Sequence, residues 1–300
     1  MHSDSGGSPP SSSIALVTGG DFEFSDVVFF FGYYGMAYNI TAYSIAGSWP
    51  GQDDEAPLDV EYSTAMSNSY GSPLDTAHVY VYEEGNNYLS TIATVYNTIV
   101  SDDHAKTVST SYGWTEGGSD DSWETLTMHP IFNMMVGEGW TLIAAAGDGG
   151  TTDSCSDAIN VDWPASDPDF LAAGGTELLL NSSGNYVSEI AWVGETWTNN
   201  GGACASNHGG GGGGVSTVFS APDWQSPLGY SMRAMPDISL TANPDVMGEL
   251  YYYNGQWWTE GGTSIVAPEL AGSLPRKTPT STTLAPFAAP PALPHVHRSA

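Results

Sequence analysis

Short apolar segments alternate with longer segments of helical periodicity along the first half of this chain. The apolar segments lie at 14–17, 78–82, 108–111 and 141–146, and the helical patterns lie near 58–70, 88–100 and 123–136. Strands that alternate with helices are joined by right-handed crossovers, which make the strands parallel and place helices over both faces of the sheet. The sequence therefore predicts an α/β fold with a parallel central sheet flanked by helices.

Periodicity is weaker beyond this region, and we expect loops to dominate residues 147–260. The glycine run at 209–214 fits a flexible linker. Because Val215 and Ser216 follow it, the run also fits a backbone wall close to a bound peptide, where glycine permits close approach. Aromatic residues on both sides of Asn254-Gly255 predict a hairpin that leads toward the last apolar stretch.

That stretch opens with Gly261-Gly262-Thr263-Ser264, which indicates a sharp turn presenting a hydroxyl at the start of a helix. Free backbone N–H groups and the positive end of the helix dipole favour a developing negative charge there. We expect Pro268 to lie in the first turn, where its missing N–H removes no hydrogen bond. Ser264 is thus a candidate nucleophile, although a plain capping Thr-Ser pair at a helix start shows the same pattern.

A nucleophilic serine needs a base, and no histidine in the chain fits that role well. Histidine-triad peptidases of the subtilisin type carry an Asp, then a His at a helix start, then the Ser, and no such order precedes Ser264. His78 heads an alternating pattern typical of a strand, and His208 lies in a glycine-rich loop. A histidine base is therefore the disfavoured alternative.

Carboxylates offer another base. Glu55 and Asp59 lie four residues apart around Pro57, so a helix that starts near Pro57 places both acids on one face and in contact. Asp148 follows the segment 141–146, at the strand end where α/β sheets usually bind ligands. A solvated acidic helix start and an ordinary turn aspartate are the alternative interpretations.

Together these motifs resemble the sedolisin family, the serine-carboxyl peptidases, over roughly residues 13–273. The matching segments follow the family's order: Ile14-Ala15-Leu16-Val17 with Gly19-Gly20, Glu55-Ala56-Pro57-Leu58-Asp59, Ser109-Thr110-Ser111-Tyr112-Gly113, Ala146-Gly147-Asp148-Gly149-Gly150, Trp163-Pro164-Ala165-Ser166, Gly214-Val215-Ser216, Met235-Pro236-Asp237 and Gly261-Gly262-Thr263-Ser264. One segment alone is weak, but this many in order are specific. The resemblance implies that the predicted α/β fold is subtilisin-like.

The resemblance also implies an acid-active serine-type endopeptidase that works through an acyl-enzyme. Ser264 would be the nucleophile, Glu55 the general base, and Asp59 the residue that orients Glu55. Asp148 would donate a hydrogen bond to the oxyanion of the tetrahedral intermediate. The alternative function is that of a truncated, non-catalytic secreted homologue of such a peptidase.

In the family, the segment at Ser111, Tyr112 and Gly113 lines the substrate, so peptides or proteins are the expected substrates. Thr18 and Tyr112 stand where some members carry a Glu and a Trp that support the catalytic glutamate. The outer surroundings of that glutamate therefore depart from the family pattern in this chain. We expect the protein to act as a monomer.

Catalysis by carboxylates predicts activity in acid. Histidine has a free pKa of about 6.5 and is scarcely neutral a few units lower, whereas glutamate, at about 4.3, retains an ionised fraction near pH 4. An aspartate at position 148 can donate to an oxyanion only while it keeps its proton, which low pH or an apolar setting secures.

The charge balance agrees with a protein that works in an acidic medium. Five Lys and Arg against 34 Asp and Glu give a formal net charge of −29 at pH 7, and self-repulsion on that scale destabilises a fold near neutrality. Adaptation to high salt would leave the same composition. Nucleic acid and anionic membranes are poor partners for such a surface, and no apolar stretch is long enough to span a bilayer. We therefore expect a secreted protein.

Features outside the catalytic motifs are less defined. Cys155 and Cys204 lie in polar loops and could form one disulfide. The resemblance implies Ca²⁺, bound by a loop well downstream of the serine, but the sequence offers no matching ligands, and we assign no metal ligand. Residues 1–12 and the Pro-rich 274–300 cannot build a core, so we expect disorder there and interpret the chain as truncated at both ends.

Overall fold

The computed structural model describes most of the chain. The described residues are 13–45, 53–68, 76–85, 89–152, 159–193 and 209–274, with the backbone alone of 198–199, 204–205 and 297–298. The predicted tails lie outside these ranges, apart from residues 274 and 297–298. The predicted pairing of Cys155 with Cys204 also lies outside the described side chains.

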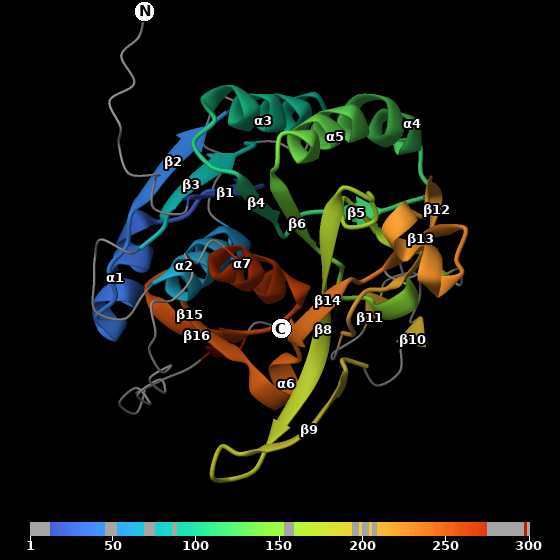
Figure 1. Cartoon of the computed structure of the whole chain (residues 1–300). Coiled ribbons are helices and arrows are strands. Elements are labelled where there is room, and N and C mark those ends of the chain that lie inside the picture. Colours follow the sequence, from blue (N-terminus) through green and yellow to red (C-terminus); the bar gives the residue numbers. More distant parts are fainter. Residues whose placement is uncertain are drawn as a thin grey trace, which may run out of the picture.

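A central sheet forms the middle layer of the molecule (Figure 1). Its strands lie in the order β14 (Ile238–Thr241), β8 (Phe170–Leu180), β6 (Thr141–Ala145), β4 (Thr107–Thr110), β1 (Ser13–Thr18), β3 (His78–Glu83) and β2 (Ile40–Ser44). Every neighbouring pair in this order is parallel, and β9 (Tyr186–Ala191) adds an antiparallel strand beside β8. The predicted parallel α/β fold is confirmed.

Helices cover both faces of this sheet (Figure 1). One face carries α1 (Phe24–Tyr34), α2 (Glu55–Ser67) and α7 (Thr263–Ser273), and the other carries α3 (Leu89–Asp102) and α5 (His129–Gly137). Side chains of β1 alternate between the two layers, because Ile14 and Leu16 pack in one core and Ala15 and Val17 in the other. Burial on both faces explains why these strands read as continuous apolar runs.

The strand register gathers predicted site residues at one edge of the sheet. Val17 is the register partner of Thr110, and Thr110 is the partner of Ala144. Parallel strands therefore end together here, and the residues that follow them, Ser111 and Asp148, come to the same edge.

The expectation that loops dominate residues 147–260 is wrong. β8 and β14 are both strands of the central sheet, and β12 (Gly214–Ser220) pairs with β13 (Met232–Met235). β8 contains Gly174 and Gly175, which weaken a strand pattern in the sequence. Gly174 is needed for close packing, because a Cβ there would lie 2.4 Å from Cγ of Pro236.

The predicted hairpin is present, formed by β15 (Glu249–Tyr253) and β16 (Gln256–Glu260). Its turn residues, Asn254 and Gly255, have φ angles of 51° and 73°, the left-handed conformation that such a two-residue turn requires. The chain then leaves β16 and enters α7 directly, so the hairpin delivers the glycine turn of the candidate nucleophile.

The remaining described elements are short. They are β5 (Trp114–Thr115), β7 (Asp162–Trp163), β10 (Thr198–Asn199), β11 (Cys204–Ala205), β17 (His297–Arg298), α4 (Asp121–Trp123), α6 (Pro244–Met247), a π-helix at Glu124–Met128 and 3-10 helices at Gly150–Thr152 and Asp223–Leu228. Within the described residues, every helix is too short or too polar to cross a bilayer.

Candidate active site

Ser264 is the second residue of α7 and directly follows a glycine turn. Gly262 has a φ angle of 97°, a conformation that favours glycine. A side chain at Gly262 would also collide with Asp148, since a Cβ there would lie 2.6 Å from Asp148 Oδ2. The glycine turn therefore places Ser264 at a helix N-terminus, as predicted, and allows Asp148 to approach it.

Pro268 does not lie in the first turn, contrary to the prediction, because α7 begins at Thr263. Proline has no N–H, so the carbonyl of Ser264, four residues earlier, lacks its helical donor. The hydroxyl of Ser111 lies 3.0 Å from this carbonyl oxygen, and its single proton is shared between this oxygen and Asp59 Oδ1. An interior proline thus creates an acceptor that ties the end of β4 to the start of α7.

Glu55 and Asp59 lie one turn apart at the start of α2, as predicted. Asp59 is 1% exposed, and its Oδ1 accepts a 2.6 Å hydrogen bond from the Ser111 hydroxyl. Glu55 interacts with both Asp59 and Ser264, and Glu55 Oε1 and Asp59 Oδ2 are buried with no hydrogen-bond partner among the described residues. The two acids and the serine predicted as a catalytic group are therefore brought together.

Burial raises the pKa of Glu55 and the pKa of Asp59 well above the ordinary values for carboxyl groups. The charges of Asp59 and Asp148 raise the pKa of Glu55 further, and the hydrogen bond with Ser264 lowers it. Hydrogen bonding with Ser111 and with Glu55 lowers the pKa of Asp59. Carboxyl groups this close titrate as a coupled unit, which retains protons well above the pH at which a free carboxyl loses them.

Asp148 follows β6 and is held in place by Thr263. Its Oδ1 accepts hydrogen bonds from the backbone N–H of Thr263 at 2.7 Å and from the Thr263 hydroxyl at 2.9 Å. The Thr263 Oγ1 accepts in turn from the N–H of Gly147 at 3.0 Å. A carboxyl group fixed beside a serine at a helix N-terminus is a suitable donor to an oxyanion while it is protonated.

The segment predicted to line the substrate, Ser111 to Gly113, directly follows β4. The Ser111 hydroxyl is engaged by Asp59 and by the Ser264 carbonyl, and the Tyr112 hydroxyl donates to Asp53 Oδ2 at 2.6 Å. Both hydroxyls thus form hydrogen bonds within the protein. The substrate-binding role of this segment stays a prediction, and it concerns mainly the backbone.

The described histidines have partners away from Ser264. His78 is the first residue of β3, as predicted, and its Nε2 lies 2.8 Å from the Thr41 hydroxyl. The Nδ1 of His129 lies 3.0 Å from Asp167 Oδ2. His208 lies outside the described residues. The structure thus offers carboxylates rather than histidine beside the serine.

One group of side chains in the described part of the chain has spacing suited to a metal: His129, Asp167 and Asp169. A hydrogen bond with Asp167 raises the pKa of His129, and the charges of both aspartates raise it further. A protonated imidazole cannot bind a metal, so an ion pair is favoured in acid. The group does not fit Ca²⁺ either, which takes about six to eight oxygen ligands. The calcium loop expected downstream of Ser264 would lie outside the described residues.

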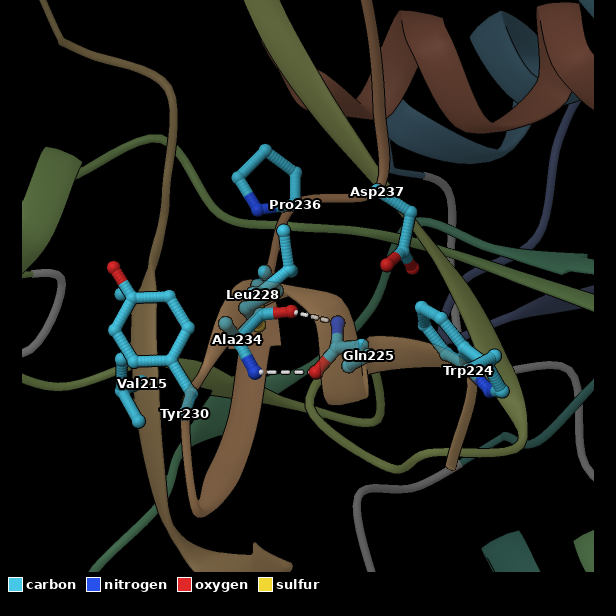
Figure 2. A pocket seen from close by; sticks show the side chains of 10 residues that line it. Val215, Trp224, Gln225, Leu228, Tyr230, Ala234, Pro236 and Asp237 are labelled. Atoms are coloured by element: carbon cyan, nitrogen blue, oxygen red, sulfur yellow. Dashed lines mark hydrogen bonds between the residues drawn. The ribbon is translucent and has the colours of Figure 1, made fainter. Parts of the chain in front are cut away.

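A cavity of about 440 Å³ lies beside the β12–β13 pair (Figure 2). Trp224, Leu228 and Tyr230 line it, and each is more than half exposed. Gln225 is held by the backbone of Ala234, through hydrogen bonds of 2.6 Å and 2.9 Å drawn in Figure 2. The predicted catalytic residues are not part of its lining, so this cavity is separate from the carboxylate group.

Two residues of the site were not found from the sequence. The sequence motifs include Thr263 only as part of the turn, and they do not include Asp53. Asp53 accepts the N–H of Ala56 at 2.9 Å, which is a helix-capping contact. An Asp just ahead of a helix start is a recognisable capping signal, whereas its bond with Tyr112 depends on the tertiary fold.

The sequence is similar to two curated proteins. It is 28% identical over 230 residues to sedolisin of Pseudomonas sp. (strain 101), covering 74% of this chain and 38% of that protein. It is 32% identical over 239 residues to kumamolisin of Bacillus sp. (strain MN-32), covering 75% of this chain and 39% of that protein. The chain thus spans about two fifths of the length of these relatives. No family model matches it.

The structure is similar to that of Pseudomonas sedolisin, a serine-carboxyl proteinase, in complex with two molecules of pseudo-iodotyrostatin. The TM-score is 0.75 at 26% identity, and the match covers 90% of this chain and 76% of that chain. A structure of the subtilase cytotoxin matches with a TM-score of 0.53 at 12% identity, covering 87% of this chain and 74% of that chain, which is a likeness of fold alone.

Proposed function

The chain carries a catalytic domain of the sedolisin family, and from this premise we propose that it is an acid-active serine-type endopeptidase. The observation that carries the proposal is the group of Glu55, Asp59 and Asp148 around Ser264 at the start of α7. Each of these side chains has a chemical part in acyl transfer, and the described histidines lie elsewhere.

In the acylation step, the Ser264 hydroxyl attacks the scissile carbonyl carbon while Glu55 accepts its proton. Asp59 holds Glu55 in position, and the two carboxyl groups titrate together. Neutral Asp148 donates its proton in a hydrogen bond to the oxyanion that forms. Glu55 then returns the proton to the leaving amine, the peptide C–N bond breaks, and the acyl group stays on Ser264.

In the deacylation step, Glu55 takes a proton from water, and the resulting hydroxide adds to the acyl carbon. The tetrahedral intermediate collapses, Ser264 leaves as its alkoxide, and Glu55 protonates it. The cycle needs one ionised carboxylate, Glu55, and one neutral carboxyl, Asp148, at the same time. Burial raises the pKa of Glu55 and opposes its ionisation, so the proposal requires Glu55 to give up its proton at a lower pH than Asp148 does.

The substrate and the location of the enzyme belong to the same proposal. We expect an unfolded or extended peptide to lie along the segment after β4, near Gly113, because a peptide backbone can pair with an exposed strand end. An acid optimum and a net charge of −29 at pH 7 suit a protein secreted into an acidic medium.

A pH–rate profile on an acid-denatured protein substrate tests the proposal. Cleavage should rise below pH 5 and be negligible at pH 7.5, because the neutral carboxyl donor is lost as pH rises. Ser264→Ala and Glu55→Gln should each abolish turnover while leaving the thermal transition in place. An optimum above pH 7 would reject the carboxylate mechanism, and peptide binding without turnover by the parent would favour the non-catalytic alternative.

A further inference from the structure

Asp53 joins two elements of the active site through its two carboxylate oxygens. Oδ1 accepts the N–H of Ala56 at 2.9 Å, in the first turn of α2 where Glu55 begins the helix. Oδ2 accepts the hydroxyl of Tyr112 at 2.6 Å, from the segment that follows β4. One side chain therefore connects the start of the helix that carries Glu55 with the end of a central strand.

The loop after β1 packs closely against this contact. A Cβ at Gly20 would lie 2.0 Å from Asp53 Oδ2, and a Cβ at Gly19 would lie 2.7 Å from Cε1 of Tyr112. The backbone N–H of Asp53 donates to the carbonyl of Asp21 at 3.2 Å, which ties Asp53 to the same loop. The two glycines thus press against the Asp53–Tyr112 contact.

Both neighbours of this contact belong to the proposed catalytic group. Glu55 lies two residues after Asp53, and Ser111, which precedes Tyr112, holds Asp59 at 2.6 Å and the Ser264 carbonyl at 3.0 Å. We propose that Asp53 and Tyr112 form a positioning pair that fixes Glu55 against Ser264. This proposal rests on the proposed peptidase function, and neither residue needs to touch substrate for it.

The pair also sets the charge beside Glu55. Burial raises the pKa of Asp53, and the hydrogen bond from Tyr112 opposes that rise and favours the ionised form. Ionised Asp53 raises the pKa of Glu55. The other titratable groups that interact with Asp53 or Glu55 are Asp54, Asp59, Glu83, Asp148, Tyr251 and Tyr253.

Two substitutions test the pair by kinetics. Tyr112→Phe keeps the ring and removes the hydroxyl, and Asp53→Asn removes the charge and one acceptor. Each should lower kcat on the order of 10-fold to 100-fold, the scale of a small misplacement of a catalytic group, with KM changed less than kcat. Residue 53 carries less negative charge in both variants, because asparagine is neutral and because Asp53 without the Tyr112 hydrogen bond ionises less readily. The pKa of Glu55 therefore falls, and the acid limb of the kcat profile moves to lower pH.

Tyr82→Phe is a matched control, because the Tyr82 hydroxyl donates to Asp102 at 3.2 Å, in a second Tyr–Asp contact outside the proposed catalytic group. It should leave the kcat profile unchanged. Parent-like kcat and an unmoved acid limb in both Tyr112→Phe and Asp53→Asn would overturn the positioning role. If Asp53→Asn does not fold, Tyr112→Phe alone decides.

A readout without turnover separates this proposal from the proposed function. The ¹³C carboxyl resonance of Glu55, assigned through Glu55→Gln, reports its pKa directly. A lower pKa in Tyr112→Phe and Asp53→Asn supports the pair even if the parent cleaves no peptide, in which case the peptidase function alone is lost. An unchanged titration of Glu55 overturns the pair even if the parent is an active peptidase.

Discussion

Thr263 determines which oxygen of Asp148 can carry a proton. Both Thr263 donors reach Oδ1, so a neutral Asp148 places its proton on Oδ2. An asparagine at this position would keep its amide oxygen toward the same donors and present its NH₂ group in place of Oδ2. The amide donor does not titrate, whereas the carboxyl donor is lost when Asp148 ionises.

We therefore expect different results from two substitutions of Asp148. Asp148→Ala removes the donor and should lower kcat on the order of 10²- to 10³-fold, the usual loss for one oxyanion donor. Asp148→Asn should retain more of kcat and keep it to higher pH than the parent. Measuring kcat from pH 3 to pH 8 for the three proteins checks this. Equal losses in the two variants would remove Asp148 from the donor role.

The Ser111 hydroxyl links two parts of the proposed active site. It contacts Asp59 and also the Ser264 carbonyl, which Pro268 leaves without a helical donor. Ser111→Ala should lower the free energy of unfolding by about 1–3 kcal/mol, the cost of leaving buried polar groups unpaired, and should also lower kcat. Urea unfolding measures the first effect.

Ser109→Ala is the control for Ser111→Ala. Ser109 is buried in β4, the strand that ends just before Ser111, and its hydroxyl has no hydrogen-bond partner among the described residues. Its removal should leave the free energy of unfolding unchanged or slightly higher. Comparable losses for both alanine variants would mean that the Ser111 contacts add nothing to stability.

At the scale of residues, local pattern predicted Ser264, Glu55 and Asp148, since each stands in a recognisable turn, helix start or strand end. The contact of Asp53 with Tyr112 could not be predicted in this way. Its partners are 59 residues apart, and only the meeting of α2 with the end of β4 brings them together. The same holds for the contact of Ser111 with the Ser264 carbonyl, which lacks a helical donor only because Pro268 lies inside α7.

The two helices that carry the proposed catalytic residues, α2 and α7, lie side by side on the sheet (Figure 1). Gly272 of α7 allows the two helices to pack closely, because a Cβ there would lie 2.4 Å from the Ser63 carbonyl oxygen and 2.7 Å from Cβ of Met66. The separation of Glu55 from Ser264 therefore depends on a glycine well outside the motif around the serine.

Gly272→Ala should push α2 and α7 apart. We expect a loss of about 1–3 kcal/mol in the free energy of unfolding, as for other overpacked cores, and a lower kcat as the base moves from the nucleophile. Gly32→Ala is the matched control, since Gly32 is a helical glycine of α1 whose added Cβ would meet no atom within 4 Å apart from its chain neighbours and the backbone of its own helix. It should be neutral or stabilise by up to about 1 kcal/mol. Thermal melts and kcat of both variants check this, and a fully active, stable Gly272→Ala protein would contradict it.

Among the elements, sequence pattern predicted β1, β3, β4 and β6 because each is a short apolar run between helical segments. It missed α1, whose apolar residues, Val27 to Tyr34, give no clear polar face and whose start has no side-chain cap. It also missed β2, where the pattern is partly polar and every residue is half-buried. Both lie toward the edge of the fold, where tertiary packing rather than periodicity decides the structure.

At the scale of the whole molecule, acidic groups are buried without enough cations to pair them. The one lysine and one arginine among the described side chains are engaged by other acids, Lys106 by Asp103 and Arg233 by Asp237. Burial raises the pKa of Glu83 to about 8 and the pKa of Glu124 to about 7. The same cause raises the pKa values of Glu61, Glu84 and Glu269.

These shifts fix the sign of the pH dependence of stability. An unfolded glutamate has a pKa of about 4.3, so between that pH and the raised pKa the folded protein binds more protons than the unfolded chain. Stability is therefore fully present below about pH 4.3 and is lost as pH rises toward 8. Growing repulsion among ionised surface acids acts in the same direction.

The melting temperature should accordingly be highest near pH 4 and fall steadily toward pH 8. A fully buried group such as Glu83 contributes up to about 1.4 kcal/mol per pH unit across this window. Glu83→Gln removes the ionisation and keeps the shape, so it should leave the free energy of unfolding nearly unchanged at pH 4 and raise it at pH 7. Glu23→Gln, at an exposed position, should change neither value. Urea unfolding of the three proteins at both pH values decides it. A parent that gains stability from pH 4 to pH 8 would show that the buried acids are ionised in the fold.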